Sequence, residues 1–260
     1  MPDTAKLAAA EAGDAATPGA DLVALRTEID RLDDALHDLL MRRAEVVARL
    51  AASRTKGNGP ALRPGREALI LRRLLARHAG PLPRAALVRL WRELLAATTA
   101  MQSPLTVAAC LPEAGMEVLR SHLGLAAPVK RLGREAAALA ESEAGRAALV
   151  ALPASGRWWR THYPSRLFAT ARLPFFGTAD CTVFLLSPAP PDASGDDRTL
   201  VRVPVRGEAG LAAAGLPPAV LTREDDLALV ELPGMIALGD PRLASLGATV
   251  LGAYATPVAA

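Results

Sequence analysis

Four polar side chains stand where the helical periodicity of the first hundred residues predicts buried apolar ones. They are Arg43, Glu67, Thr98 and Gln102. Burying a charge is unfavourable by several kcal/mol unless it is paired. One explanation is that the four side chains pair with one another, through an Arg43–Glu67 ion pair and a Thr–Gln hydrogen bond. The other is a polar ligand site, which we favour because all four occur in one small bundle.

Two further arginines lie on the helix that carries Arg43. Arg54 is eleven residues beyond Arg43, so at about 100° per residue the two share one face. Arg26 is seventeen residues before Arg43 and lies about 100° away around the helix. Arg26 therefore suits the pocket of an antiparallel partner better than a pocket of its own chain. Such cations favour an anionic ligand.

Three helices are predicted to position these residues. The first runs from Asp21 to about Arg54, and its apolar residues recur at spacings of three and four. It would be roughly 50 Å long, too long for a domain of this size to cover, so we expect a partner subunit along it. A second helix is predicted over Arg66–His78 and a third over Arg84–Gln102, with Gly- and Pro-containing breaks between them.

The sequence pattern changes after Pro104. Short buried strands alternate with helices, which indicates an α/β or α+β region. The sequence PAPPDASGDD reads as a linker between two of the strands. The predicted fold class is therefore multi-domain, with an all-α helical bundle followed by an α/β (α+β) C-terminal region.

Composition excludes several classes of function. Residues 21–103 hold 15 Lys/Arg against 9 Asp/Glu, a net of +6, although the chain as a whole is only +3. With 3% aromatic residues, a stacking surface for nucleic acid is not expected. Two distant cysteines argue against a disulfide framework and a cysteine-based zinc site. No apolar run is long enough to span a membrane, and residues 1–20 read as a loose tail of a cytoplasmic protein.

The first domain resembles a known family. The run LRTEIDRLDDALHDLLMRRAEVV, the pair Arg66-Glu67 and the run LVRLWRELLAATTAMQ resemble the all-helical (type II) chorismate mutases over residues 21–103. The resemblance implies an interlocked helical homodimer that converts chorismate to prephenate. It implies no metal and no cofactor, because the rearrangement is concerted and needs neither.

The resemblance also assigns roles to the arginines. Arg26 matches the arginine that each subunit donates to its partner's site, and Arg43 matches the one that grips a substrate carboxylate. Arg54 stands where the family has a lysine that contacts carboxylate and ether oxygen, and Lys56 is the alternative for that role. Arg and Lys differ in geometry, so this position stays open.

Further matches come from the second and third helices. Glu67 matches the acid that binds the ring hydroxyl, and Arg66 the cation beside it. Thr98 stands where the family often has serine, and Gln102 matches the donor to the ether oxygen. Arg63 departs from the family, which often has aspartate there, and this removes one hydroxyl contact.

The second half resembles a different enzyme more weakly. Residues 104–190 resemble a degenerate lobe of prephenate dehydratase, and residues 198–260 resemble a regulatory ACT region. The dehydratase's catalytic Thr-Arg-Phe is matched to Thr182-Val183-Phe184, which lacks the arginine. We therefore expect a non-catalytic remnant here.

The sequence thus predicts a chorismate mutase, an isomerase. The alternatives are a bifunctional chorismate mutase/prephenate dehydratase and a non-catalytic helical dimerisation or regulatory protein. A feedback effector and the main product of the pathway are not predicted.

Overall fold

A computed structural model describes residues 18–54, 62–161 and 167–260 of the chain. The chain divides into two compact units, residues 1–52 and 53–260, and each is described by itself. Residues 1–17, which include most of the predicted tail, lie outside the described residues.

The first unit contains most of a single helix, α1, Pro18–Arg54. It begins three residues before the predicted start at Asp21, and its end agrees with the prediction. Its apolar seam is largely exposed, with Ile29 56%, Leu32 61% and Leu39 63% exposed. An exposed apolar stripe of this length is typical of an interaction surface.

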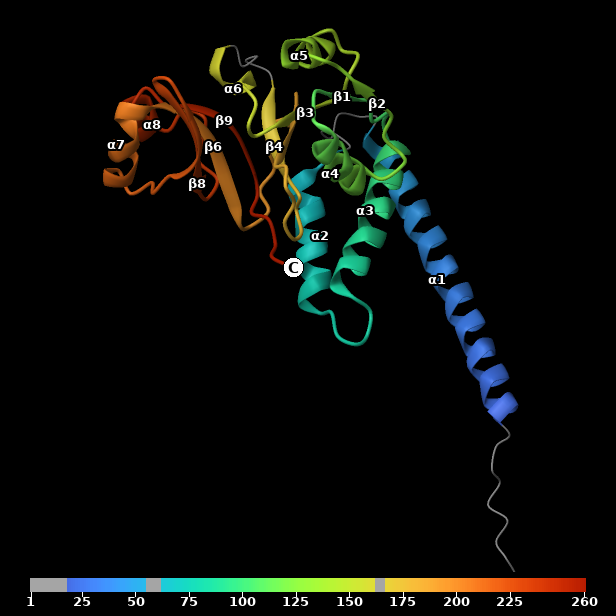
Figure 1. Cartoon of the computed structure of the whole chain (residues 1–260). Coiled ribbons are helices and arrows are strands. Elements are labelled where there is room, and N and C mark those ends of the chain that lie inside the picture. The colour runs from blue at the N-terminus through green and yellow to red at the C-terminus, as the bar shows by residue number, and fades with distance from the viewer. Residues whose placement is uncertain (1–17, 55–61, 162–166) are drawn as a thin grey trace, which may run out of the picture. The chain divides into compact units, whose positions relative to one another are not determined.

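The second unit begins with a pair of helices that pack on each other (Figure 1). They are α2, Pro64–Ala76, and α3, Arg84–Ala100. Leu71, Leu75, Leu87 and Leu95 are buried between these helices and Phe175. Both helices were predicted, with bounds that differ by at most two residues from the observed ones.

The remainder of the second unit is built on one nine-stranded sheet. The first five strands are β1 (Val107–Ala109), β2 (Val129–Arg131), β3 (Leu149–Pro153), β4 (Phe168–Leu173) and β5 (Val183–Ser187). The last four are β6 (Asp197–Pro204), β7 (Ala219–Glu224), β8 (Leu227–Pro233) and β9 (Thr249–Ala255). Their order is β2-β1-β3-β5-β4-β9-β6-β8-β7. The sheet is mixed: β2, β1 and β3 are parallel neighbours, and β3 pairs antiparallel with β5.

Helices cover both faces of the first five strands. One is α4, Glu113–Leu123, whose Met116 and Leu119 are buried on one face. The other face is covered by α5, Glu135–Glu143, and α6, Trp158–Thr161, through Leu139 and the two tryptophans. Every residue of β5 is buried, and its first four residues, VFLL, are accordingly all apolar rather than alternating with polar ones.

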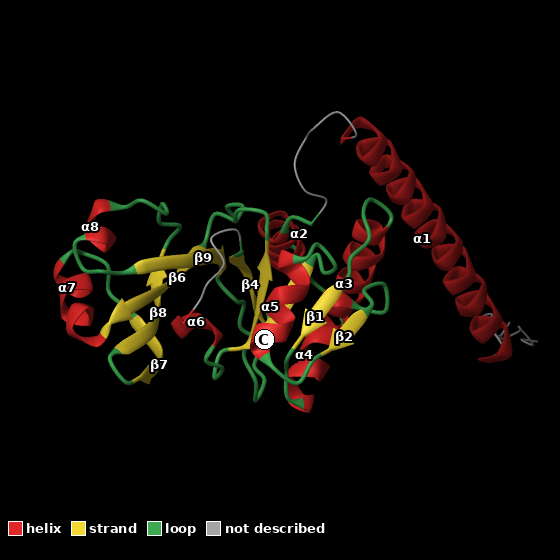
Figure 2. Cartoon of the chain, turned by 90° about the horizontal axis from the view of Figure 1, so that it is seen from above, coloured by secondary structure: helices red, strands yellow, loops and turns green. Residues whose placement is uncertain are grey.

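The last four strands form a βαββαβ arrangement with two short helices. These are α7, Glu208–Ala213, which follows the 3₁₀ turn Val205–Gly207, and α8, Pro241–Ala244. Leu211 and Leu243 of these helices pack on Val201 and Val230 of the sheet. Figure 2 shows α7 and α8 beside strands β6, β7 and β8. The strand order β9-β6-β8-β7 is that of a ferredoxin-like split βαβ fold. The predicted fold class, helices followed by an α/β region, is confirmed.

One glycine allows the two parts of the sheet to join. Gly252 of β9 has φ +152° and pairs with Ala169 of β4. A Cβ at this position would overlap the backbone of Ala169. Residue 252 must therefore lack a side chain for the single sheet to form.

Candidate functional site

Glu67 lies in the first turn of α2, and the start of that helix is set by a distant segment. The side chain of Asp192 accepts hydrogen bonds from the backbone N–H groups of Gly65 at 2.9 Å and Arg66 at 3.2 Å. Asp192 belongs to the connection between β5 and β6. It satisfies N–H groups that have no partner within the helix, and its charge suits the helix N-terminus. The C-terminal half of the chain thus fixes the position of Glu67.

A buried ion pair holds the Glu67 carboxylate. Nη1 of Arg92, on α3, donates to its Oε2 at 2.9 Å, and the two side chains are only 7% and 13% exposed for Arg92 and Glu67. Burial raises the pKa of Glu67, although the Arg92 charge opposes this rise, and the nearby Asp192 adds to it. Burial also lowers the pKa of Arg92. Both shifts disfavour the charged forms, so desolvation outweighs the attraction within the pair.

His122 of α4 adjoins this pair. Arg92 Nη1 lies 3.5 Å from His122 Nε2. Burial, and then the charge of Arg92, lower the pKa of His122 well below its ordinary value. The imidazole is therefore neutral at neutral pH, and Nε2 faces the guanidinium as an acceptor.

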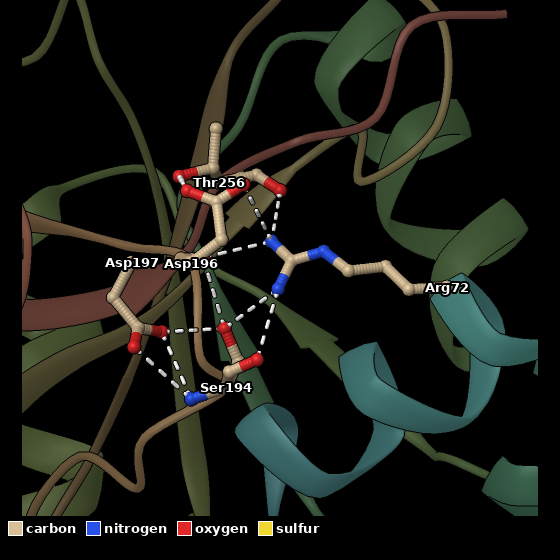
Figure 3. Close-up of polar contacts among 5 residues, drawn as sticks. All are labelled: Arg72, Ser194, Asp196, Asp197 and Thr256. Carbon is tan, nitrogen blue, oxygen red and sulfur yellow. Dashed lines mark hydrogen bonds and ion pairs between the residues drawn. The ribbon is translucent and has the colours of Figure 1, made fainter.

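A second arginine fastens α2 to the sheet (Figure 3). Nη1 of Arg72 donates to the carbonyl oxygen and the hydroxyl of Ser194. Its Nη2 donates to the carbonyl oxygens of Asp196 at 2.8 Å and Thr256 at 2.7 Å. Ser194 is itself held by Asp197 through its backbone N–H and its hydroxyl. The segment predicted as a linker does connect β5 to β6, but it also binds α2 along its length.

The side chains of Thr98 and Gln102 both donate hydrogen bonds to backbone carbonyl groups of α3. The Thr98 hydroxyl donates to the carbonyl oxygen of Leu94 at 2.7 Å, and Gln102 Nε2 donates to the carbonyl oxygen of Thr98 at 3.0 Å. The Gln102 amide lies just beyond the last residue of the helix. Thr98 is buried and Gln102 is partly buried.

The remaining predicted residues fall into three groups. Arg26 is exposed and Arg43 is partly buried on α1, and burial lowers the pKa of Arg43. The backbone of Arg54 ends α1, whereas its side chain and all of Lys56 lie outside the described residues.

The third group is Arg66, in the first turn of α2, and Arg63, just before that helix. Arg66 is exposed, and its backbone N–H binds Asp192. Arg63, which replaces the aspartate of the family, lies with its Nε 3.4 Å from the Asp192 carboxylate. The structure brings Arg63, Arg66 and Glu67 together around Asp192 and pairs Glu67 with Arg92.

Sequence reasoning missed Arg92, Asp192, Arg72 and His122. Arg92 follows Trp91 on the buried side of α3, and the seam through Val88 and Leu95 signals its burial. Asp192 and Arg72 act across more than a hundred residues of sequence, so no local spacing could have indicated them.

The described ranges also bear on metal and membrane binding. No cluster of three or more His, Cys, Asp or Glu residues there could hold a metal ion. Within those same ranges, no helix combines the length and apolar character needed to cross a bilayer.

Comparison with known proteins identifies the helical segment. The sequence model of the family described as chorismate mutase type II matches residues 25–103. These residues match the chorismate mutase type II family. The matched segment contains most of α1 and all of α2 and α3.

Curated relatives match the chain over a similar length. The bifunctional chorismate mutase/prephenate dehydratase of Pseudomonas aeruginosa is 38% identical over 97 residues, which is 35% of this chain and 27% of that protein. The protein of the same description from Neisseria gonorrhoeae is 37% identical over 92 residues, 35% of this chain and 25% of that protein. The chain thus spans about a quarter of the length of these relatives.

A solved structure aligns with a longer part of the chain. Prephenate dehydratase from Arthrobacter aurescens in complex with L-Phe aligns with a TM-score of 0.46 and 13% identity, over 59% of this chain and 90% of that one.

Proposed function

We propose that this chain is a chorismate mutase that rearranges chorismate to prephenate. The observation that carries the proposal is the family match over residues 25–103, within which the polar residues expected of such a site are present. The reaction is intramolecular and concerted. The protein therefore has to fold the flexible enolpyruvyl ether over the ring and to stabilise charge in the transition state.

Arginines are suited to the first task. Arg43 and a partner subunit's copy of Arg26 would bind the two carboxylates of chorismate through charge-assisted, bidentate hydrogen bonds. The exposed apolar seam of α1 supports a homodimer in which that helix is covered by a second copy. We propose that each site is built from two chains and that the enzyme works in the cytoplasm.

Gln102 and a nearby cation, Arg54 or Lys56, are proposed to meet the negative charge on the ether oxygen. Loss of one such preorganised donor typically raises the barrier by about 3–4 kcal/mol. Glu67 is proposed to accept a hydrogen bond from the ring hydroxyl of chorismate. Arg66 lies beside it in the sequence, and Thr98 is proposed to contribute to the site from α3. The Asp192 cap supports this role because it holds the turn that carries Glu67.

The test is the disappearance of chorismate in the presence of the purified full chain. We expect turnover by the unaltered protein, loss of turnover in Arg43→Ala and retention in Arg42→Ala, which removes an adjacent exposed arginine. Circular dichroism of both variants checks that the helices persist. Unchanged turnover in Arg43→Ala would refute the site, and no turnover by the unaltered chain would refute the function.

The C-terminal half is proposed to be a non-catalytic region made of a dehydratase-like part, residues 104–190, and an ACT-like part, residues 198–260. Val183, matched to the dehydratase arginine, is fully buried in β5, which supports a structural role for that position. Incubation with prephenate tests this proposal, because formation of phenylpyruvate at neutral pH would favour the bifunctional reading instead.

A further inference from the structure

A cavity of about 460 Å³ lies beside the Glu67–Arg92 pair, between α3, α4 and the connection from β4 to β5. This volume is within the usual range for sites that hold small molecules. Its wall includes Val88, Arg89, Arg92, His122, Phe175 and Phe176. The cavity belongs entirely to the second unit, and none of the residues proposed for chorismate lines it.

Two guanidinium groups line one side of the cavity. Arg89 and Arg92 are three residues apart on α3 and therefore neighbours on its surface. Arg92 is held in place by Glu67 through Nη1 alone, and its Nε and Nη2 donate to none of the residues that the structure describes. A buried guanidinium that is fixed by one carboxylate and has unused donors is preorganised for a second anion.

Apolar groups make up much of the remaining wall. The Phe175 ring is buried with its centroid 5.1 Å from the Arg92 guanidinium carbon, and Phe176, Val88 and Val118 extend the apolar wall. An occupant that only carried charge would leave this wall uncovered. The cavity therefore suits a molecule with an apolar body and one anionic end.

The charges around the cavity limit how much negative charge its ligand can carry. Arg89 and Arg92 are opposed by Glu67, which pairs with Arg92, and by the exposed Glu117 in the lining. His122 adds no charge at neutral pH because burial and Arg92 lower its pKa. A ligand with two or more negative charges would meet the Glu117 carboxylate as well as the arginines, so a monoanion fits best.

We propose that this cavity is a binding site for a small organic monocarboxylate with an apolar body. The carboxylate binds Arg89 and Arg92, and the body lies against Phe175 and Phe176. None of the residues proposed to bind chorismate lines this cavity, although Arg92, which does line it, pairs with Glu67 of the proposed chorismate site. Arg92 and Thr98 are six residues apart on α3, which places them about 120° apart around the helix.

The experiment is a titration of the full chain with cyclohexanecarboxylate and with benzoate. Binding is monitored by calorimetry and by the NMR signals of the His122 ring. We expect saturable binding, a shift of the His122 signals, and much weaker binding of uncharged benzamide. Arg89→Gln should weaken binding roughly tenfold, since it removes one charge-assisted hydrogen bond. Arg89→Lys should retain part of the affinity, and Arg73→Gln, an equal charge change on the exposed face of α2, should retain all of it.

Three results would overturn the proposal. One is no saturable binding of either carboxylate at millimolar concentrations. Another is equal affinity for benzamide, which would mean that the arginines do not recognise the ligand. The third is an Arg89→Gln variant that binds as tightly as the Arg73→Gln control. Because chorismate is absent from the experiment, its outcome is independent of the proposed mutase activity.

Discussion

Replacing Arg92 by methionine leaves the Glu67 carboxylate buried without its partner. The two side chains are almost completely buried and joined at 2.9 Å. Removal of one member of such a pair typically destabilises a protein by about 3–5 kcal/mol. For a unit of this size each kcal/mol lowers the melting temperature by about 2–4 °C, so a fall of about 6–20 °C is expected.

The loss of stability in Arg92→Met should depend on pH, and the direction of this dependence follows from the pKa of Glu67. Burial raises the pKa of Glu67 in the folded state, and loss of Arg92 removes the main interaction that lowers it. A carboxyl group whose folded-state pKa lies above its unfolded value binds its proton more tightly when folded. Stability is then gained as the pH falls through the folded pKa and lost as it rises. The penalty of Arg92→Met should therefore be smaller at mildly acidic pH than at neutral pH.

Thermal and urea unfolding at the two pH values measure this penalty. The matched control is the double variant Glu67→Leu/Arg92→Met, which removes both charges. Because burial outweighs attraction in the native pair, the double variant should be more stable than Arg92→Met alone. A loss below about 1 kcal/mol in Arg92→Met, or an equal loss at both pH values, would refute the reasoning.

Three further predictions concern α2, the sheet and the proposed reaction. Arg72→Met should lower the free energy of unfolding by at least about 2 kcal/mol, because four hydrogen bonds to Ser194, Asp196 and Thr256 are lost; urea unfolding against Arg73→Met checks this. Gly252→Ala should destabilise the sheet by about 1–3 kcal/mol or more, because its Cβ would overlap Ala169; thermal unfolding measures it. Gln102→Glu should make chorismate turnover fall from mildly acidic to neutral pH, because a carboxyl group must be protonated to donate, whereas the unaltered enzyme should show no such loss through this residue; a pH–rate profile distinguishes them.

Each of these predictions has a contradicting outcome. Equal unfolding free energies for the Arg72 and Arg73 variants would mean that the contacts of Figure 3 contribute no net stability. A Gly252→Ala protein as stable as the parent would show that the sheet tolerates a side chain there. A steep loss of activity towards neutral pH in the unaltered enzyme would remove Gln102 from its proposed role.

The helices were predictable because their signals are local. The three–four spacing of α1 and the Gly- and Pro-containing breaks around α2 and α3 each lie within a few residues of what they specify. The exact start of α2 was not predictable. It depends on Asp192, which lies 127 residues from Gly65 in the sequence.

The candidate site was predictable only in part, for the same physical reason. The types and spacing of Arg43, Glu67 and Gln102 could be recognised along the chain. The burial of Arg92 against Glu67 could not be read in the same way, because a basic residue on an amphipathic helix is usually solvated and its partner is specified only by packing. The strands that follow β6 were suggested only by the resemblance of residues 198–260 to an ACT region, and not by periodicity.

Complementation between two inactive variants tests most directly whether two chains build the active site. Arg26→Ala and Arg43→Ala proteins would be unfolded together, refolded, and assayed for chorismate turnover beside each variant alone. Mixed dimers would contain one intact site, formed by Arg43 of one chain and Arg26 of the other. We predict that each variant alone is nearly inactive and that the mixture regains about a quarter of the normal activity, as random pairing requires. A mixture no more active than the variants alone would contradict the account.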